Sequence, residues 1–171
     1  TYTGDGVAGR EIPHNLGASV GMAIVKSTSH ATPWLVNHVD IPDNYLTLET
    51  DDGALSDVKM TSTASIITWT GSDVYYNKAG HEYVAYLFAN DDSPDSLIEY
   101  GSYTGNQTAG NEVDLGFEPQ FVLIKASSSK GEWYMFDTMR GIVTGGFDPF
   151  LRANMSAVES ASSERLEVNP T

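Results

Sequence analysis

The side chains best suited to chemistry are the aromatic residues near position 70. Trp69, Tyr75 and Tyr76 flank a Thr-Gly-Ser-Asp turn. Aromatic faces stack on the apolar faces of pyranose rings, and neighbouring Asn and Asp side chains can bind the sugar hydroxyls. These three residues are therefore a candidate carbohydrate-binding site. The alternative is that alternate members face the core, because side chains of a strand alternate between its two faces.

A loop rich in acidic residues offers a second kind of site. Asp91, Asp92 and Asp95 lie close together in the sequence, and Ca²⁺ takes carboxylate and carbonyl oxygens from loops of this sort. The spacing does not follow the D-x-D-x-D-G pattern of a preorganised calcium site, so a solvated loop is the competing interpretation. We expect no cofactor, with Ca²⁺ at these three residues as the alternative.

The sequence carries no recognised catalytic motif. It has no G-x-S-x-G elbow and no GK[ST] loop, and the G-D-G-x-x-G of residues 4–9 does not stand between a strand and a helix. There is no cysteine, and the four histidines lack metal-ligand spacing. A glycosidase would need a pair of carboxylates across a cleft, and nothing singles out such a pair among the 23 acidic residues. We therefore expect a protein that is not an enzyme, with no catalytic residues.

Charge and hydropathy exclude two classes of partner. Nine Lys and Arg residues against 23 Asp and Glu residues give a formal net charge of −14, which repels phosphate backbones. No apolar run approaches the roughly 18 residues needed to span a membrane. We expect neither nucleic-acid binding nor a membrane span. The sequence opens inside a repeated motif without an initiator Met, so we expect a segment of something longer.

The sequence repeats itself. Residues 2–34 begin YTGDGVAGREIPHNLG, and residues 103–133 begin YTGNQTAGNEVDLG. Tyr2 and Tyr103 match at an offset of 101 (103 − 2), whereas Leu16 and Leu115 match at an offset of 99 (115 − 16) after a two-residue contraction. The second register continues to Trp133, the counterpart of Trp34, and we expect both tryptophans in the core. This pattern indicates an internal duplication of about a hundred residues.

Short runs rich in β-branched and aromatic residues, bounded by turn residues, predict an all-β protein. The fold we expect is an antiparallel β-sandwich of jelly-roll or lectin-like type, built from two related repeats with a β-β-β meander in each. The repeats would be residues 1–98 and 99–171, packed together as one body. The predicted strands are 22–25, 34–36, 45–48, 65–69, 73–76, 83–88, 121–124, 133–136 and 165–168. Residues 154–164 suit a loop with one turn of helix.

Three motifs carry a resemblance to a known family. They are YTGNQTAGNEVDLGFEPQFVLIK, W-Y-M-F-D-x-x-R-G at 133–141 and N-x-x-G-x-x-YVAYLFA at 77–89. Together they resemble a tandem-repeat domain of uncharacterised bacteriophage proteins, especially of marine and cyanobacterial phages. Those proteins look like tail-fibre, tailspike or other virion surface components.

The comparison of the two repeats predicts two differences. The first repeat has a closing N-x-x-G-x-x-YVAYLFA strand and the second has none, so we expect the second sheet to need a strand from elsewhere. The rest of the polypeptide, a neighbouring subunit or an incomplete chain would each explain this.

The second repeat alone has the Asp137 and Arg140 pair, followed by Gly141, which predicts either a buried ion pair at a corner or a surface pair of little energetic worth.

The resemblance implies a virion structural protein in a tail fibre, spike or surface decoration, located outside the host cell. It would self-associate, with a trimer as one expected state, bind other virion proteins and attach to a host-surface glycan. The alternatives are a lectin-like carbohydrate-binding module and a polysaccharide depolymerase.

Overall fold

The computed structural model describes residues 1–57, 60–91, 93–108, 110–142, 147–161 and 166. All its strand pairs are antiparallel, and no helix occurs among these residues. The predicted all-β, antiparallel fold class is therefore confirmed.

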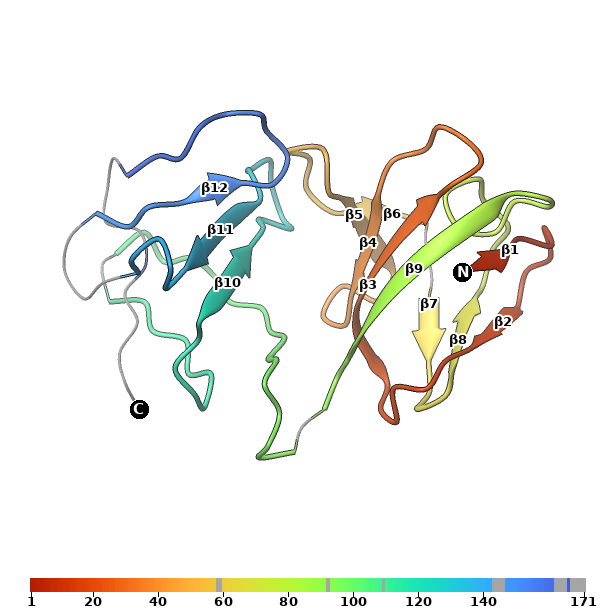
Figure 1. Cartoon of the computed structure of the whole chain (residues 1–171), viewed down its shortest axis with the longest axis horizontal. Coiled ribbons are helices and arrows are strands. Elements are labelled where there is room, and N and C mark those ends of the chain that lie inside the picture. The colour runs from red at the N-terminus through yellow and green to blue at the C-terminus, as the bar shows by residue number, and fades with distance from the viewer. Residues whose placement is uncertain (58–59, 92, 109, 143–146, 162–165, 167–171) are drawn as a thin grey trace. The chain divides into compact units, whose positions relative to one another are not determined.

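The chain divides into two compact units (Figure 1). The first unit comprises Thr1–Leu48 and Asp52–Ser102, and the second comprises Glu49–Asp51 and Tyr103–Thr171. The boundary that we predicted between residues 98 and 99 thus lies between 102 and 103. Glu49–Asp51 joins the second unit because the Asp51 carbonyl accepts a hydrogen bond from Gly131 N (2.8 Å).

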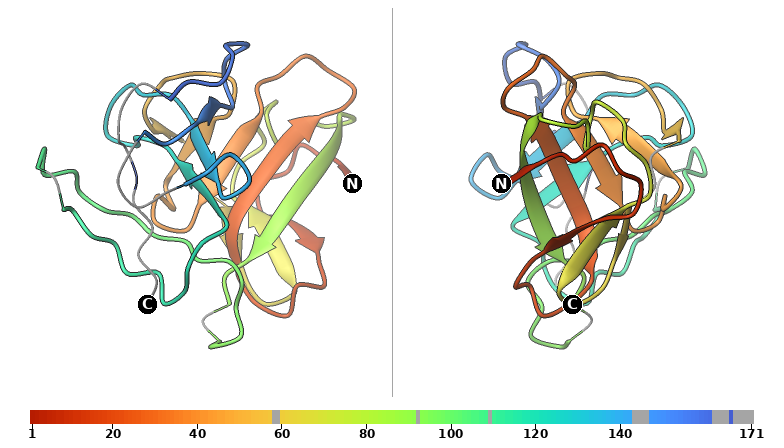
Figure 2. Two further views of the ribbon diagram at one scale, coloured as in Figure 1. Left: turned by 60° about the vertical axis from the view of Figure 1, so that its left-hand side comes forward. Right: turned by 90° about the vertical axis from the view of Figure 1, so that its right-hand side faces the viewer.

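Two sheets form the first unit. The larger has the order β1-β9-β3-β4-β5-β6, and its strands are β1 (Tyr2–Thr3), β3 (Val20–Ser27), β4 (Leu35–His38), β5 (Asn44–Thr47), β6 (Leu55–Ser56) and β9 (Glu82–Ala89). The smaller has the order β2-β8-β7, with β2 (Arg10–Pro13), β7 (Met60–Ser62) and β8 (Ile66–Trp69). Figure 2 shows the long strands β3 (orange) and β9 (green) side by side.

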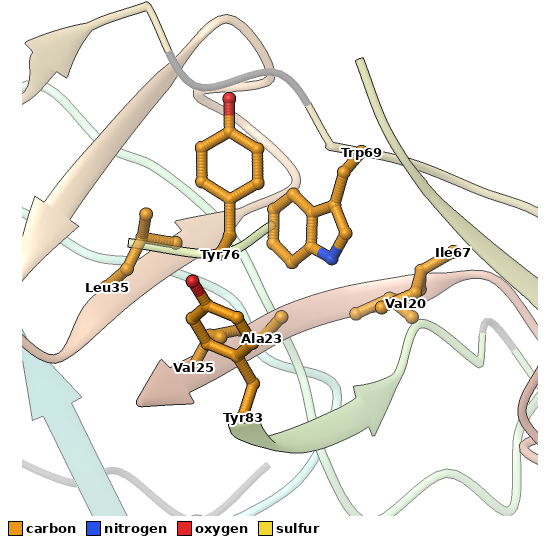
Figure 3. Close-up of a cluster of buried hydrophobic side chains, with 8 residues drawn as sticks. All are labelled: Val20, Ala23, Val25, Leu35, Ile67, Trp69, Tyr76 and Tyr83. Atoms are coloured by element: carbon orange, nitrogen blue, oxygen red, sulfur yellow. The ribbon is translucent and has the colours of Figure 1, made fainter. Parts of the chain in front are cut away.

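The core of the first unit lies between these two sheets. The strand sequences VGMAIVKS and EYVAYLFA place every second side chain on the inner face, where it is removed from water. Ile67 and Trp69 of β8 meet side chains of the larger sheet, and Tyr76 comes from the following turn (Figure 3). The buried cluster consists of Val20, Ala23, Val25, Leu35, Ile67, Trp69, Tyr76 and Tyr83. This packing makes the first unit a β-sandwich.

The second unit contains one described sheet, with the order β10-β11-β12. Its strands are β10 (Phe121–Ile124), β11 (Tyr134–Asp137) and β12 (Leu151–Arg152). On one face the rings of Tyr134, Phe136 and Phe150 pack together, with Phe136 and Phe150 buried. Trp133, just before β11, is also buried. The Phe136 and Phe150 rings lie 5.9 Å apart, which is a normal aromatic contact.

Most predicted strands are present, and one prediction is wrong. The runs at 22–25, 34–36, 45–48, 65–69, 83–88, 121–124 and 133–136 overlap β3, β4, β5, β8, β9, β10 and β11. Residues 73–76 form a turn instead, because Asp73 caps the chain: its carboxylate accepts from Tyr75 N (3.0 Å) and its carbonyl from Asn77 N (2.8 Å). Of the run 165–168, only Leu166 is described, outside any strand. Residues 154–161 contain no helix.

Candidate functional site

The three strands of the second unit have the same register as their sequence counterparts in the first. β10 and β11 pair as Phe121↔Asp137, Val122↔Phe136, Leu123↔Met135 and Ile124↔Tyr134. β3 and β4 include the pairs Met22↔His38, Ala23↔Asn37, Ile24↔Val36 and Val25↔Leu35. Each residue of the first set follows its counterpart by 99 positions (121 − 22), which is also the offset between Leu16 and Leu115 in the sequence. The third strands, β12 and β5, then pair with the residues at 134 and 135 and with those at 35 and 36.

The units differ at the outer edge of this meander. In the first unit β9 pairs with β3 along seven residue positions, whereas no described strand pairs with the corresponding side of β10. Strand β10 is therefore an edge strand, visible at the border of its sheet in Figure 1. Edge strands present unpaired backbone groups to which another strand can add.

The direction of the backbone groups follows from one hydrogen bond in each unit. Thr138 N donates to Gln120 O (3.0 Å), on the β11 side. Because successive residues of an antiparallel strand point their N–H and C=O groups in opposite directions, Val122 faces β11 whereas Phe121 and Leu123 face the open edge. The equivalent bond in the first unit, between counterparts, is Val39 N to Gly21 O (2.8 Å).

Three exposed apolar side chains in the second unit are counterparts of residues that contact β8 or β9 in the first. Tyr103, Val113 and Phe121 are exposed by 54%, 48% and 52%. Their counterparts meet partners. Tyr2 stacks on Tyr83 with ring centroids 5.2 Å apart, Ile12 pairs with Ile67, and Met22 pairs with Phe88. The exposed side chains thus correspond to positions that have a partner on β8 or β9 in the first unit.

The YTG turn shows the same contrast. In the first unit, a Cβ on Gly4 would collide with the carbonyl group of Lys78, and Gly4 N donates to His81 O (2.8 Å). In the second unit, a Cβ on Gly105 would meet nothing within 4 Å. A glycine is therefore required by close packing at position 4 and faces open space at position 105.

Asn77 fixes the turn that covers the first YTG motif. Its side chain is fully buried; Nδ2 donates to Val7 O (2.8 Å) and Asp5 Oδ1 (3.1 Å), while Oδ1 accepts from Asp5 N (3.1 Å). The backbone N–H of Val7, followed by smaller contributions that include Asn77, lowers the pKa of the Asp5 carboxyl. Tyr2 Oη also donates to Tyr76 O (2.6 Å). Together these bonds hold the residues before β9 against the start of the unit.

The Asp137 and Arg140 pair forms in the second unit. Arg140 Nη1 lies 2.7 Å from Asp137 Oδ2, and Arg140 N donates to Asp137 Oδ1 (2.9 Å). The Arg140 side chain is 25% exposed and the Asp137 side chain 16%, so the ion pair is partly buried, neither of the two predicted alternatives. Gly141 has φ = 101°, which suits glycine, and Glu159 Oε2 lies 3.5 Å from Arg140 Nε. The group therefore stabilises the corner after β11.

The predicted carbohydrate site at Trp69, Tyr75 and Tyr76 is wrong for its two principal members. Trp69 is 0% exposed and Tyr76 is 2% exposed, and their rings lie 4.7 Å apart inside the core. Tyr75 packs against the same core and against Tyr45. Side chains removed from water in this way cannot stack on a sugar. Trp69 is buried because strand side chains alternate between the two faces of a sheet and Trp69 lies on the inner one. Tyr76 is buried because the turn at Asp73 directs its side chain into the core.

A different aromatic pair reaches the surface. Trp34, which we expected in the core with Trp133, is only partly buried and stacks on the exposed Tyr86 with ring centroids 6.4 Å apart. Trp133 is buried as expected. Sequence reasoning missed the Trp34 and Tyr86 pair, because the contact depends on the register between β4, β3 and β9.

The candidate calcium residues do not form a metal site in the part of the chain that is described. No group of three or more His, Asp or Glu side chains suited to a metal occurs there. Asp91 Oδ1 instead accepts a hydrogen bond from Ser93 N (3.1 Å), which is a local turn interaction. Asp92 lies outside the described residues, and Asp95 joins no such group.

One apolar pocket of the first unit is too small for a typical ligand. A cavity of about 100 Å³ lies in the first unit between Val20, Asn37, His38 and Met60, whereas small-molecule sites usually exceed about 300 Å³. Asn37 Oδ1 is buried there without a hydrogen-bond partner. Its counterpart is Phe136, which fills the corresponding place in the second unit with an aromatic ring. The cavity is therefore better explained as a difference in packing than as a binding site.

The protein is all-β, and among the described residues β3 of the first unit has a partner strand on both sides, whereas β10 of the second has one on the β11 side alone. Residues 1–169 match the family described as "Domain of unknown function (DUF7483)". The chain belongs to this family. No curated protein and no solved structure matches the chain. No helix in the described part of the chain is long and apolar enough to cross a membrane.

Proposed function

We propose that this chain is a structural module of a bacteriophage virion, part of a tail fibre, spike or surface decoration, without enzymatic activity. The assignment to a phage particle rests on the resemblance of the three motifs at 77–89, 103–125 and 133–141. The role in assembly rests on one structural observation, the open edge of β10. An edge of this kind pairs with any suitable extended strand that it meets.

Exposed apolar side chains of the second unit support a role in assembly. Phe121 of β10 is 52% exposed, and Tyr103 and Val113, which precede β10 in the sequence, are 54% and 48% exposed, whereas their counterparts in the first unit are partly buried. Covering apolar surface is favourable by roughly 25 cal/mol per Å². A contact at this edge would therefore combine backbone hydrogen bonds with apolar burial, as interfaces between subunits do.

The proposal predicts self-association, with a trimer as one expected state. Light scattering during size-exclusion chromatography, over a range of protein concentrations, should show an oligomer. Phe121→Lys and Leu123→Pro should shift the chain toward monomer, because they place a charge at the edge and remove an outward N–H group. Met139→Lys changes another exposed apolar residue of the same unit and serves as the control. A monomer at every concentration would refute self-association.

Carbohydrate binding is the second candidate function, and the Trp34 and Tyr86 pair favours it. Stacked, partly exposed rings on a sheet can receive the apolar face of a pyranose. Tyr86→Ala should abolish binding to host cells or to a glycan array, whereas Trp69→Ala should lower stability through loss of a buried side chain. Wild-type protein without any glycan hit would rule this candidate out.

A further inference from the structure

The first unit shows what kind of strand the open edge of the second unit accepts. We infer that the outer edge of β10 binds a segment of the type of residues 76–89, which we name the closing segment. It consists of a turn with a buried Asn, followed by an eight-residue strand that begins with Glu82 and continues with aromatic and aliphatic residues only. This inference rests on the proposed function and specifies the partner of the same edge.

The first argument is the match between the edges of β10 and β3. Met22 and Ile24 point their backbone groups toward β9, as the bond from Val39 N to Gly21 O requires. There they lie opposite Phe88 and Tyr86. The counterparts of Met22 and Ile24 are Phe121 and Leu123, which present the same backbone groups without a described partner strand. A strand like β9 could therefore form the same series of backbone hydrogen bonds with β10 that β9 forms with β3.

The second argument is the match between the YTG turns. In the first unit the closing segment supplies three contacts. Tyr76 O accepts from Tyr2 Oη, the Tyr83 ring stacks on Tyr2, and His81 O accepts from Gly4 N. In the second unit the counterparts, Tyr103 and Gly105, are exposed, and the space at the Gly105 Cα is open. In the first unit one segment occupies both the strand edge and the turn, and we extend this arrangement to the second unit.

The chemistry of the partner follows from these contacts. Its strand runs antiparallel to β10, with aromatic residues opposite Phe121 and Leu123 as Phe88 and Tyr86 lie opposite their counterparts. Cross-strand aromatic and aliphatic pairs favour such a register. Its turn brings a backbone carbonyl to Gly105, as Lys78 does to Gly4. An extended peptide of another sequence could form the backbone hydrogen bonds with β10 but would lack the turn that contacts Tyr103 and Gly105.

A labelled peptide of residues 76–90, YNKAGHEYVAYLFAN, tests the inference with the full 171-residue chain. We expect saturable binding at one site per chain in fluorescence anisotropy. The same peptide N-methylated at Tyr86 keeps its composition but cannot donate the hydrogen bond at that position. It should bind at least about tenfold more weakly, since loss of one ladder bond and the added methyl group each oppose pairing.

Variants of the chain locate the binding site. Leu123→Pro removes an N–H group that faces the edge and leaves the β11 side of β10 intact, and Phe121→Lys tests the same edge without a proline. Each should weaken peptide binding about tenfold or more, whereas Met139→Lys should not. Circular dichroism of each variant reports whether the fold persists, and the N-methylated peptide keeps the test valid if one variant fails to fold.

Gly105→Ala separates the closing segment from a generic strand. Added methyl bulk at this position should weaken binding of the 76–90 peptide, because its turn must approach Gly105. The same variant should bind the shorter peptide of residues 82–90 as well as the wild-type chain does. Equal loss for both peptides, or no loss for either, would contradict the turn contact.

The outcomes also distinguish this inference from the proposed function. Peptide binding to a chain that never self-associates would support the inference and refute homo-oligomeric assembly. A chain that self-associates through Leu123 but neither binds nor is dissociated by the 76–90 peptide would support assembly and overturn the inference. Absence of saturable peptide binding to a monomer would likewise overturn it.

Discussion

Gly4→Ala and Gly105→Ala make the same substitution in two copies of one motif, and we predict opposite effects on stability. A Cβ at position 4 would collide with Lys78 O and lie 2.9 Å from the carbonyl carbon of Asn77. Both are backbone atoms, held by bonds such as Gly6 N to Asn77 O (3.0 Å), so they cannot turn aside as a side chain would. Overpacking of this kind costs about 1 to 3 kcal/mol.

The unfolded chain contributes to both variants. Alanine restricts the unfolded backbone more than glycine does, which favours folding by about 0.4 to 1 kcal/mol. We therefore expect Gly4→Ala to lower the free energy of unfolding of the first unit by about 1 to 2 kcal/mol. At Gly105, where a Cβ meets nothing within 4 Å, the same substitution should be neutral or slightly stabilising.

Urea denaturation measures this difference, with amide hydrogen exchange assigning each transition to its unit. A loss of about 1.5 kcal/mol should lower the melting temperature of a unit of this size by roughly 6 to 12 °C. Equal destabilisation by the two substitutions would refute the reasoning, because it would mean that Gly105 is as closely packed as Gly4. If Gly4→Ala left the stability of the first unit unchanged, the turn at Lys78 would not pack closely against the YTG motif.

Three further predictions concern polar side chains. Asn77→Ala should lower the free energy of unfolding in urea by about 2 to 4 kcal/mol, because several buried backbone and side-chain groups lose their partner. Burial, and then the stacked His30 ring 3.4 Å away, lower the pKa of His81. Since its folded pKa is below the unfolded value of 6.5, stability should fall as pH drops below about 6.5. His81→Gln should remove that part of the dependence in melting curves, and an unchanged curve would exclude this histidine as the cause. Arg140→Gln should destabilise the second unit by about 1 to 3 kcal/mol through loss of the bond to Asp137, and much less in an Asp137→Asn background.

The strands that sequence alone predicted are those with strong local signals. Phe121–Ile124 is an apolar run preceded by Pro119, and β10 has these bounds. The last seven residues of β9, at positions 83–89, are likewise all aromatic or aliphatic. The short strands β1, β6 and β12 have two residues each and exist because a neighbour pairs with them. Such strands have no local period that a sequence could display.

The site residues were harder to predict than the strands. In the sequence, Trp69, Tyr75 and Tyr76 resembled an exposed aromatic cluster. Whether a strand side chain is exposed or lies in the core depends on which face of its sheet is packed against another sheet, and the sequence of one strand does not show this. The Asp73 turn also resembled a strand, because Val74 and Tyr75 favour strands and the capping bond is not visible as a pattern. Comparison of the two repeats, in contrast, led to the prediction that the second sheet needs a strand from elsewhere, and among the described residues no strand pairs with the outer side of β10.

Amide hydrogen exchange at Leu123 and Ile24 tests the open edge most directly. At a concentration where the chain is monomeric, the Leu123 amide should exchange with solvent, since it faces the unpaired side of β10. Its counterpart Ile24, which faces β9, should be strongly protected. Addition of the 76–90 peptide should then protect Leu123. Protection of Leu123 equal to that of Ile24 in the free monomer would contradict the account, because the edge would already be paired.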